Sequence, residues 1–220
     1  PRVAGLVLTY PNVKSVITGN YIDNSFIEWT NEHDAAPDFS SEFSFGGLTI
    51  TGNMFTVNDA ASYFSGIVVK PFGTGHFVQG LSVTGNTFKS LNGTTDRIET
   101  LDDSIASLDF GLTRNVVFSA NTFNSIGQNT INPVTLQFDQ LSTASTWTLD
   151  VSGYLPFGGR AREVTSVIAE GVIENNGAGA VYAMPYVTTE VGVGGGDVAL
   201  TWPEPVKGRV HVTARVDRPI

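Results

Sequence analysis

The sequence contains no cysteine, few basic residues and no long run of apolar residues. Without cysteine no disulfide forms, so the fold must be held by packing or by association of chains. The formal net charge of −9, with only 12 lysines and arginines, disfavours nucleic acid and acidic membranes as partners. The longest apolar runs, such as 5–8 and 166–173, are far shorter than the roughly 20 residues of a spanning helix, so no membrane insertion is expected.

Charged residues are also scarce, at 15% of the chain against an average of about 25%. The 24 glycines, 10 prolines and many β-branched residues favour an all-β protein that is rich in turns. No signal peptide is recognised, and residue 1 is proline. We therefore expect the chain to be a piece of a longer protein.

One short phrase occurs four times at nearly equal spacing. Its copies are "SVITGNYI" (15–22), "LTITGNMF" (48–55), "LSVTGNTF" (81–88) and "VVFSANTF" (116–123). Their asparagines are separated by 33, 33 and 35 residues, and are Asn20, Asn53, Asn86 and Asn121. Period-2 alternation turns the bulky residues of each copy inward and the Thr or Ser residues outward. Because asparagine tolerates left-handed backbone and its amide bonds neighbouring backbone, stacked copies are expected to form a ladder.

This repeat predicts a right-handed parallel β-helix in which each copy is one turn of the coil. Further strand-like runs lie at 26–31, 65–72, 105–111 and 133–139, and segments 32–45, 70–77 and 89–104 are expected to be surface loops. The alternative is a propeller, but propeller blades are hairpin-connected and run to about 40–50 residues. The β-helix is therefore the better prediction.

The repeat ends near Leu141, and the remaining segment has a different pattern. Short alternating runs separated by Gly- and Pro-rich turns predict a small antiparallel, β-sandwich-like domain. We therefore expect two domains, a β-helix at 1–141 and a C-terminal β-domain at 142–220. The second either caps the open end of the coil or joins subunits, and the two roles are compatible.

The TGN-type phrase at coil spacing, the long loops and the short C-terminal β-domain together resemble the pectate-lyase-like β-helix proteins. Within these, the chain is most similar to the trimeric tailspikes and tail-fibre receptor-binding proteins of bacteriophages. This resemblance implies a homotrimer exposed on a virion tail, or otherwise extracellular, that binds bacterial surface polysaccharide and often depolymerises it. The resemblance covers roughly residues 10–141 for the β-helix. The chain departs from it in having only about four recognisable coils and no visible particle-binding domain.

Candidate site residues follow from an alignment of the second strand of each coil. With Trp29, Val69, Phe110 and Phe138 inward, the outward row before them is Glu28, Val68, Asp109 and Gln137. The outward row after them is Thr30, Lys70, Gly111 and Asp139. At about 4.8 Å per rung, two carboxylates two rungs apart lie about 9–10 Å apart, near the upper end of the range for inverting glycoside hydrolysis.

We therefore predict Glu28 and Asp109 as the catalytic pair, with Asp139 as the substitute for Asp109. Lys70 and Gln137 are the predicted substrate-binding residues, and Lys70 would hold an acidic sugar or lower the pKa of a nearby carboxyl. The competing interpretation is that these acids form an ordinary solvated face. The same choice applies to the loop acids, which either join a shared site or solubilise the loops: Glu32, Asp34, Asp38, Glu42, Asp96, Glu99, Asp102 and Asp103.

No metal or other cofactor is expected. The three histidines are far apart in the sequence, and two adjacent acids at 102–103 are a weak calcium signal. Two functions remain as alternatives to a polysaccharide-binding spike. One is a secreted polysaccharide lyase or epimerase, and the other is a structural trimerising tip without a glycan site.

Overall fold

The computed structural model describes residues 3–33 and 44–218 of an all-β chain. The chain divides into two compact units, residues 1–132 with 217–220 and residues 133–216. The expected boundary between residues 141 and 142 falls inside the long strand β13 (Val134–Asp150). The run 133–139, expected as a strand of the coil, thus opens the second unit instead, and that part of the prediction is wrong.

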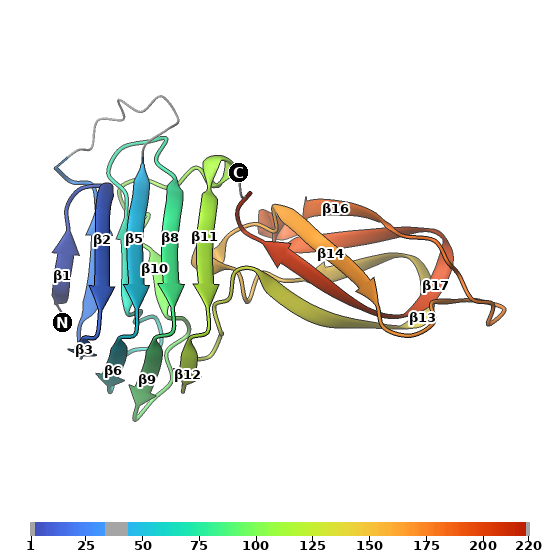
Figure 1. Cartoon of the computed structure of the whole chain (residues 1–220), viewed down its shortest axis with the longest axis horizontal. Helices are drawn as coiled ribbons and strands as arrows, with labels where there is room; N and C mark the ends of the chain where they lie inside the picture. The colour runs from blue at the N-terminus through green and yellow to red at the C-terminus, as the bar shows by residue number, and fades with distance from the viewer. Residues whose placement is uncertain (1–2, 34–43, 219–220) are drawn as a thin grey trace. The chain divides into compact units, whose positions relative to one another are not determined.

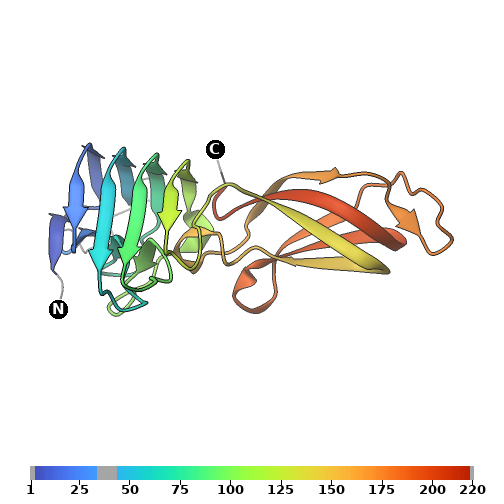
Figure 2. The same ribbon diagram turned by 90° about the horizontal axis from the view of Figure 1, so that it is seen from below.

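The first unit is a parallel β-helix made of three four-stranded sheets (Figure 1). Sheet A consists of β1 (Ala4–Leu8), β4 (Phe26–Thr30), β7 (Ile67–Lys70) and β10 (Glu99–Leu101). Sheet B consists of β2 (Asn12–Thr18), β5 (Phe45–Thr51), β8 (Val78–Thr84) and β11 (Arg114–Ser119). Sheet C consists of β3 (Tyr21–Asp23), β6 (Met54–Asn58), β9 (Thr87–Leu91) and β12 (Thr122–Asn124). Figure 2 shows the strands of successive coils side by side in chain order.

The asparagine ladder predicted from the repeat is confirmed. The Oδ1 atom of Asn53 accepts hydrogen bonds from the backbone N–H and the side-chain amide of Asn20, both at 3.0 Å. Asn86 does the same for Asn53, and Asn121 for Asn86, at 3.0–3.1 Å. Each rung is thus joined to the next by the same pair of hydrogen bonds. These bonds set the register between successive coils.

The interior columns also stack in register. Pairing in sheet B aligns Ile17, Ile50, Val83 and Phe118, all buried. In sheet C the rings of Phe55 and Phe88 lie 4.6 Å apart and nearly parallel. Bulky apolar side chains therefore fill the coil, and the Thr and Ser residues between them face outward.

Two further columns of left-handed backbone repeat with the coil. One lies within the strands of sheet B, at Lys14, Gly47, Gly80 and Asn115. The other follows the strands of sheet C, at Asn24, Asp59, Asn92 and Ser125. Sequence analysis missed both columns, because the residue types at these positions vary more than in the TGN phrase.

Sheet A contains the main error in the sequence alignment. The strand that follows β7 in sheet A is β10, so Thr100 takes the place expected for Asp109. Glu99 occupies an inward position opposite Ile67 and is only 1% exposed. Its carboxylate is satisfied by Arg97 and Thr130, which makes the buried charge tolerable. An inward glutamate breaks the apolar alternation, and the strand was therefore mistaken for a loop.

The last coil is closed by hydrogen bonds rather than by another strand. Asn132 forms an antiparallel bridge with Phe118, and its amide donates to the carbonyl of Val116 at 2.7 Å. Asp217 is fully buried and accepts hydrogen bonds from the N–H of Val116 at 2.9 Å and the Asn132 amide at 3.0 Å. These bonds satisfy the strand edge where a further coil would otherwise pair.

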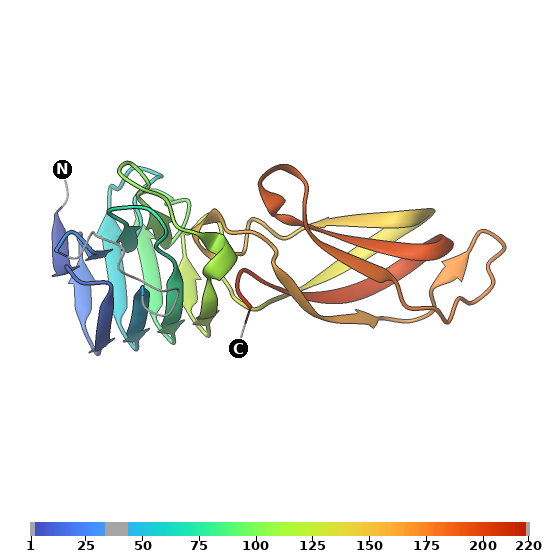
Figure 3. The same cartoon turned by 90° about the horizontal axis from the view of Figure 1, so that it is seen from above.

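The second unit is a single antiparallel sheet centred on β17 (Asp197–Arg215), shown in Figure 1 and Figure 3. Strand β13 pairs along one edge of β17. The other edge is covered in succession by β16 (Tyr186–Val191), β15 (Glu174–Asn175) and β14 (Glu163–Ala169). One face packs around Trp147 and Trp202, whose rings lie 5.0 Å apart. The antiparallel C-terminal sheet is thus confirmed.

The ladder makes a testable contribution to stability. Replacing Asn53 with alanine removes the buried amide that donates to the carbonyl of Ile17 and accepts the N–H of Asn20. We expect Asn53→Ala to lower the free energy of unfolding by roughly 2–4 kcal/mol, measured by chemical denaturation, because several buried polar groups lose their partners. Asn20→Ala, at the exposed first rung, is the matched control and should lose less. Equal losses of unfolding free energy in the two variants would show that burial of the ladder adds no stability.

Candidate functional site

A groove with a volume of about 760 Å³ lies on the outward face of sheet A. Its floor is the outward row Glu28, Val68 and Thr100, which the strand register places on successive rungs. Rungs are about 4.8 Å apart, a spacing that suits contacts with several units of an extended ligand.

One wall of the groove is the segment 59–66, between β6 and β7. The carbonyl of Ser62 accepts the N–H of Asp96 at 2.7 Å, and the hydroxyl of Ser65 donates to the carbonyl of Arg97 at 3.3 Å. Tyr63, between these two anchors, is 82% exposed. The wall therefore presents a large aromatic side chain to solvent on a backbone that is fixed on both sides.

The wall is also supported by aromatic packing between Phe64 and Phe26 of β4. The rings of Phe26 and Phe64 meet edge to face, with centroids 6.3 Å apart. Both line the groove. Such pairs add stability beyond simple burial, so this end of the groove is preformed.

Asp59 lies at the rim, where a second asparagine ladder fixes the backbone. Asn24 accepts the N–H of Asn58 at 3.0 Å, and Asn58 accepts the amide of Asn92 at 2.9 Å. Asp59 itself has left-handed backbone, with φ of 52°, and its N–H donates to the carbonyl of Leu91. The intervals of 34 residues between these asparagines are the one sequence signal that a second repeat search could have found.

Asp102 is the third carboxylate of the groove, one position beyond β10. Hydrogen bonds from Ser104, and then the ammonium group of Lys70, lower the pKa of the Asp102 carboxyl. The Lys70 Nζ lies 3.2 Å from the carboxylate. Asp102 is therefore held as an anion that can accept hydrogen bonds, and the charge of Lys70 is already paired.

The structure brings together only some of the predicted site residues. Glu28 lines the groove. Lys70 lies beside the groove, because it is two residues after Val68 on β7 and so faces the same side of sheet A. Asp109 does not lie on the strand stack. It caps the short 3₁₀ helix Phe110–Leu112, where its Oδ1 accepts the N–H of Gly111 at 2.7 Å. The predicted two-rung spacing between Glu28 and Asp109 is therefore wrong.

Gln137 and Asp139 belong to the second unit, opposite His211 and Arg209 on β17. Arg209, followed by the amide of Gln137, lowers the pKa of Asp139. These two residues therefore form a cross-strand polar cluster on the antiparallel sheet, and their expected position in the coil is wrong. They were misplaced because apolar alternation alone cannot distinguish parallel from antiparallel pairing.

The loop acids are distributed differently. Asp102 lines the groove, Glu99 is a buried partner of Arg97, and Glu32 lies 3.6 Å from His33. Asp96 donates its N–H to the wall segment, and neither it nor Asp103 lines the groove. The remaining three, Asp34, Asp38 and Glu42, lie outside the described residues.

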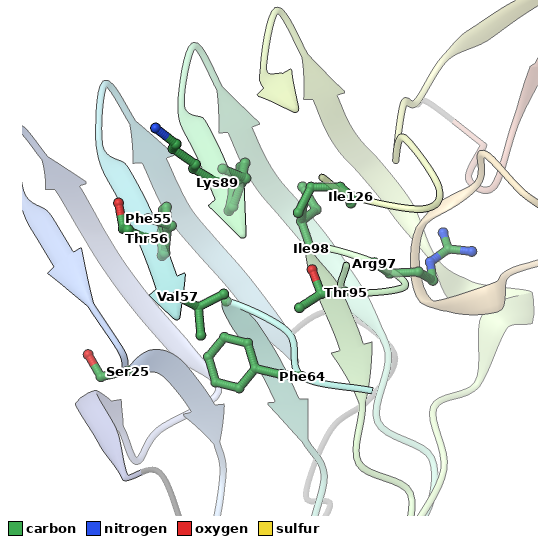
Figure 4. A pocket seen from close by; sticks show the side chains of 12 residues that line it. Ser25, Phe55, Thr56, Val57, Phe64, Lys89, Thr95, Arg97, Ile98 and Ile126 are labelled. Atoms are coloured by element: carbon green, nitrogen blue, oxygen red, sulfur yellow. The ribbon is translucent and has the colours of Figure 1, made fainter. Parts of the chain in front are cut away.

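A smaller cavity lies inside the coil beneath sheet C. In Figure 4, Val57, Phe64 and Ile98 gather around it, whereas the charged ends of Lys89 and Arg97 point away. Its volume of about 20 Å³ holds no more than one water molecule. It therefore offers no room for a sugar.

Among residues 3–33 and 44–218, no three His, Cys, Asp or Glu side chains lie close enough to hold a metal ion. The helices of the described part are all too short or too polar to span a membrane.

In comparisons with known proteins, no family model, no curated protein and no solved structure matches this chain.

The anionic state of Asp102 leads to a pH prediction. A carboxyl whose folded pKa lies below its ordinary value of 3.8 stabilises the fold above that value, and the contribution is lost as the pH falls through the folded pKa. Carbon-detected NMR titration should find the Asp102 pKa raised toward 3.8 in Ser104→Ala, and raised less in Lys70→Met. An unchanged pKa in both variants would contradict this account.

Proposed function

We propose that this chain is a receptor-binding β-helix protein of the bacteriophage tailspike type, whose groove on sheet A binds bacterial surface polysaccharide. The observation that carries the proposal is the groove itself, which combines an exposed tyrosine with carboxylates on a repeating strand face. Sugar rings present apolar C–H faces and rows of hydroxyl groups. Aromatic rings pack against the former, and ionised carboxylates accept strong hydrogen bonds from the latter.

The shape of the groove suits a polymer better than a small molecule. Its floor is built on successive strands of one sheet, and it lies open along the outside of that sheet instead of inside a closed cavity. A typical small-molecule site encloses most of its ligand. An extended polymer can lie along such an open groove and contact several rungs at once, and this supports the polysaccharide assignment.

Cleavage of the bound polymer is the second candidate function, since Glu28, Asp59 and Asp102 line one groove. Glu28 and Asp102 are then the two carboxylates that act on the glycosidic bond, one as acid and one as base. This assignment replaces Asp109 by Asp102. A secreted lyase or epimerase of the same fold class would instead use basic residues, and no lysine or arginine is among the described residues that line the groove.

Self-association is the second part of the proposal. On the β14–β16 side of the second unit, an apolar groove of about 260 Å³ is lined by side chains that include Trp202 and Val210. Three large apolar residues of its lining are 61–97% exposed, and they are Val172, Tyr182 and Met184. Exposed apolar side chains around an apolar groove are typical of an interface between chains. We infer that it joins copies of the chain into a homotrimer.

Glycan binding is tested with purified surface polysaccharides from candidate bacterial hosts. We expect Tyr63→Ala to weaken binding about tenfold, since it removes one aromatic contact, and Glu28→Gln to weaken it by a similar factor. Affinity is measured by calorimetry or biolayer interferometry, and sizing the polymer afterwards detects cleavage. The matched controls are Tyr21→Ala and Asp109→Asn, which alter an exposed tyrosine and a carboxylate outside the groove. Equal losses in controls and groove variants would refute the site.

The oligomeric state is tested by size-exclusion chromatography with light scattering. The expected mass is three times the 23.4 kDa of one chain. Met184→Asp should shift the protein toward the monomer, because a charge is buried at the proposed interface. Leu141→Asp is the control, since Leu141 is 88% exposed on the opposite edge strand β13. A monomer at micromolar concentration would remove the trimer from the proposal.

A further inference from the structure

The lining of the groove on sheet A carries negative charge. Three carboxylates line it, those of Glu28, Asp59 and Asp102, and no basic residue is among the described residues of its lining. The nearby cation, Lys70, lies 3.2 Å from Asp102 and is paired with it. When Lys70 is counted, the formal charge of the site is still negative.

The carboxylates of Asp102 and Asp59 are held in the groove by contacts with neighbouring residues. Asp102 is held as an anion by Ser104 and Lys70, which lower its pKa. Asp59 is fixed by left-handed backbone, and its Oδ2 accepts the amide of its neighbour Asn58 at 3.2 Å. Neither side chain can swing far from the groove without breaking these contacts.

We propose that the groove selects polysaccharides that lack carboxylate and sulfate groups, and that a free sugar amine strengthens binding. This inference rests on the proposed function and names the chemical class of its ligand. A ligand carboxylate placed about 5 Å from a groove carboxylate is repelled, which is expected to weaken binding at least tenfold. A sugar ammonium at the same place pairs with Glu28 or Asp59 and gains affinity.

This assignment differs from the expectation drawn from the sequence, in which Lys70 holds an acidic sugar. An acidic sugar that bound Lys70 would have to displace Asp102, and the displaced carboxylate would then face the ligand. Because both groups are partly shielded from solvent, with 27% and 34% of their side chains exposed, this exchange is unfavourable.

The test uses the whole chain and an array of purified bacterial surface polysaccharides of three kinds: neutral, amine-bearing and uronate-containing. We expect the bound polymers to be neutral or amine-bearing. Acetylation of the amines in a bound amine-bearing polymer should weaken binding several-fold, and raising the salt concentration should narrow the difference. Oxidising primary hydroxyl groups of a bound neutral polymer to carboxylates should weaken binding at least tenfold.

The variant that tests the cause is Asp59→Asn, because asparagine adopts the same left-handed backbone and keeps the shape of the side chain. It should reduce the preference for neutral over oxidised polymer several-fold, whereas Asp109→Asn should leave the preference unchanged. Preferential binding of uronate-containing polymers, or equal binding of oxidised and native polymer, would overturn this inference while the proposed function stands. Failure of every polysaccharide to bind would overturn both.

Discussion

The structure of the β-helix depends on a hydrogen-bond ladder that links one asparagine per coil. Each buried Oδ1 accepts two donors from the preceding rung, and each amide donates to a carbonyl inside the coil. The pairing leaves no room for a one-residue slip, because a slip would turn every inward side chain outward. The second ladder, through Asn24, Asn58 and Asn92, fixes the other end of sheet C.

Because the ladders fix the register between coils, other positions of the coil tolerate an inward charged residue or an excursion of the chain. Glu99 takes an inward position in sheet A because Arg97 and Thr130 satisfy its carboxylate there. The segment 59–66 leaves the coil and returns, held by backbone bonds to the next rung. The candidate groove is a product of this tolerance, since its wall is the excursion and its floor is the regular strand stack.

The sequence predicted the repeat well and the site poorly, for related reasons. The TGN phrase is local and its chemistry is nearly invariant, so its four copies align without knowledge of the structure. Sheet A has strands of only three to five residues, and their apolar alternation is too short to be distinctive. Asp109 and Asp139 were therefore assigned to the strand stack, whereas the strand that follows β7 there is β10, which contains the buried Glu99.

By itself, the sequence determined an all-β chain, a coil with one asparagine per turn and a change of architecture in its C-terminal part. Periodicity carries this information because each coil repeats the same contacts with its neighbours. Only the tertiary structure decided which carboxylates share a groove and that Lys70 is paired with Asp102. The physical reason is that a short strand takes its register from hydrogen bonds to the adjacent rungs, which its own residues do not encode.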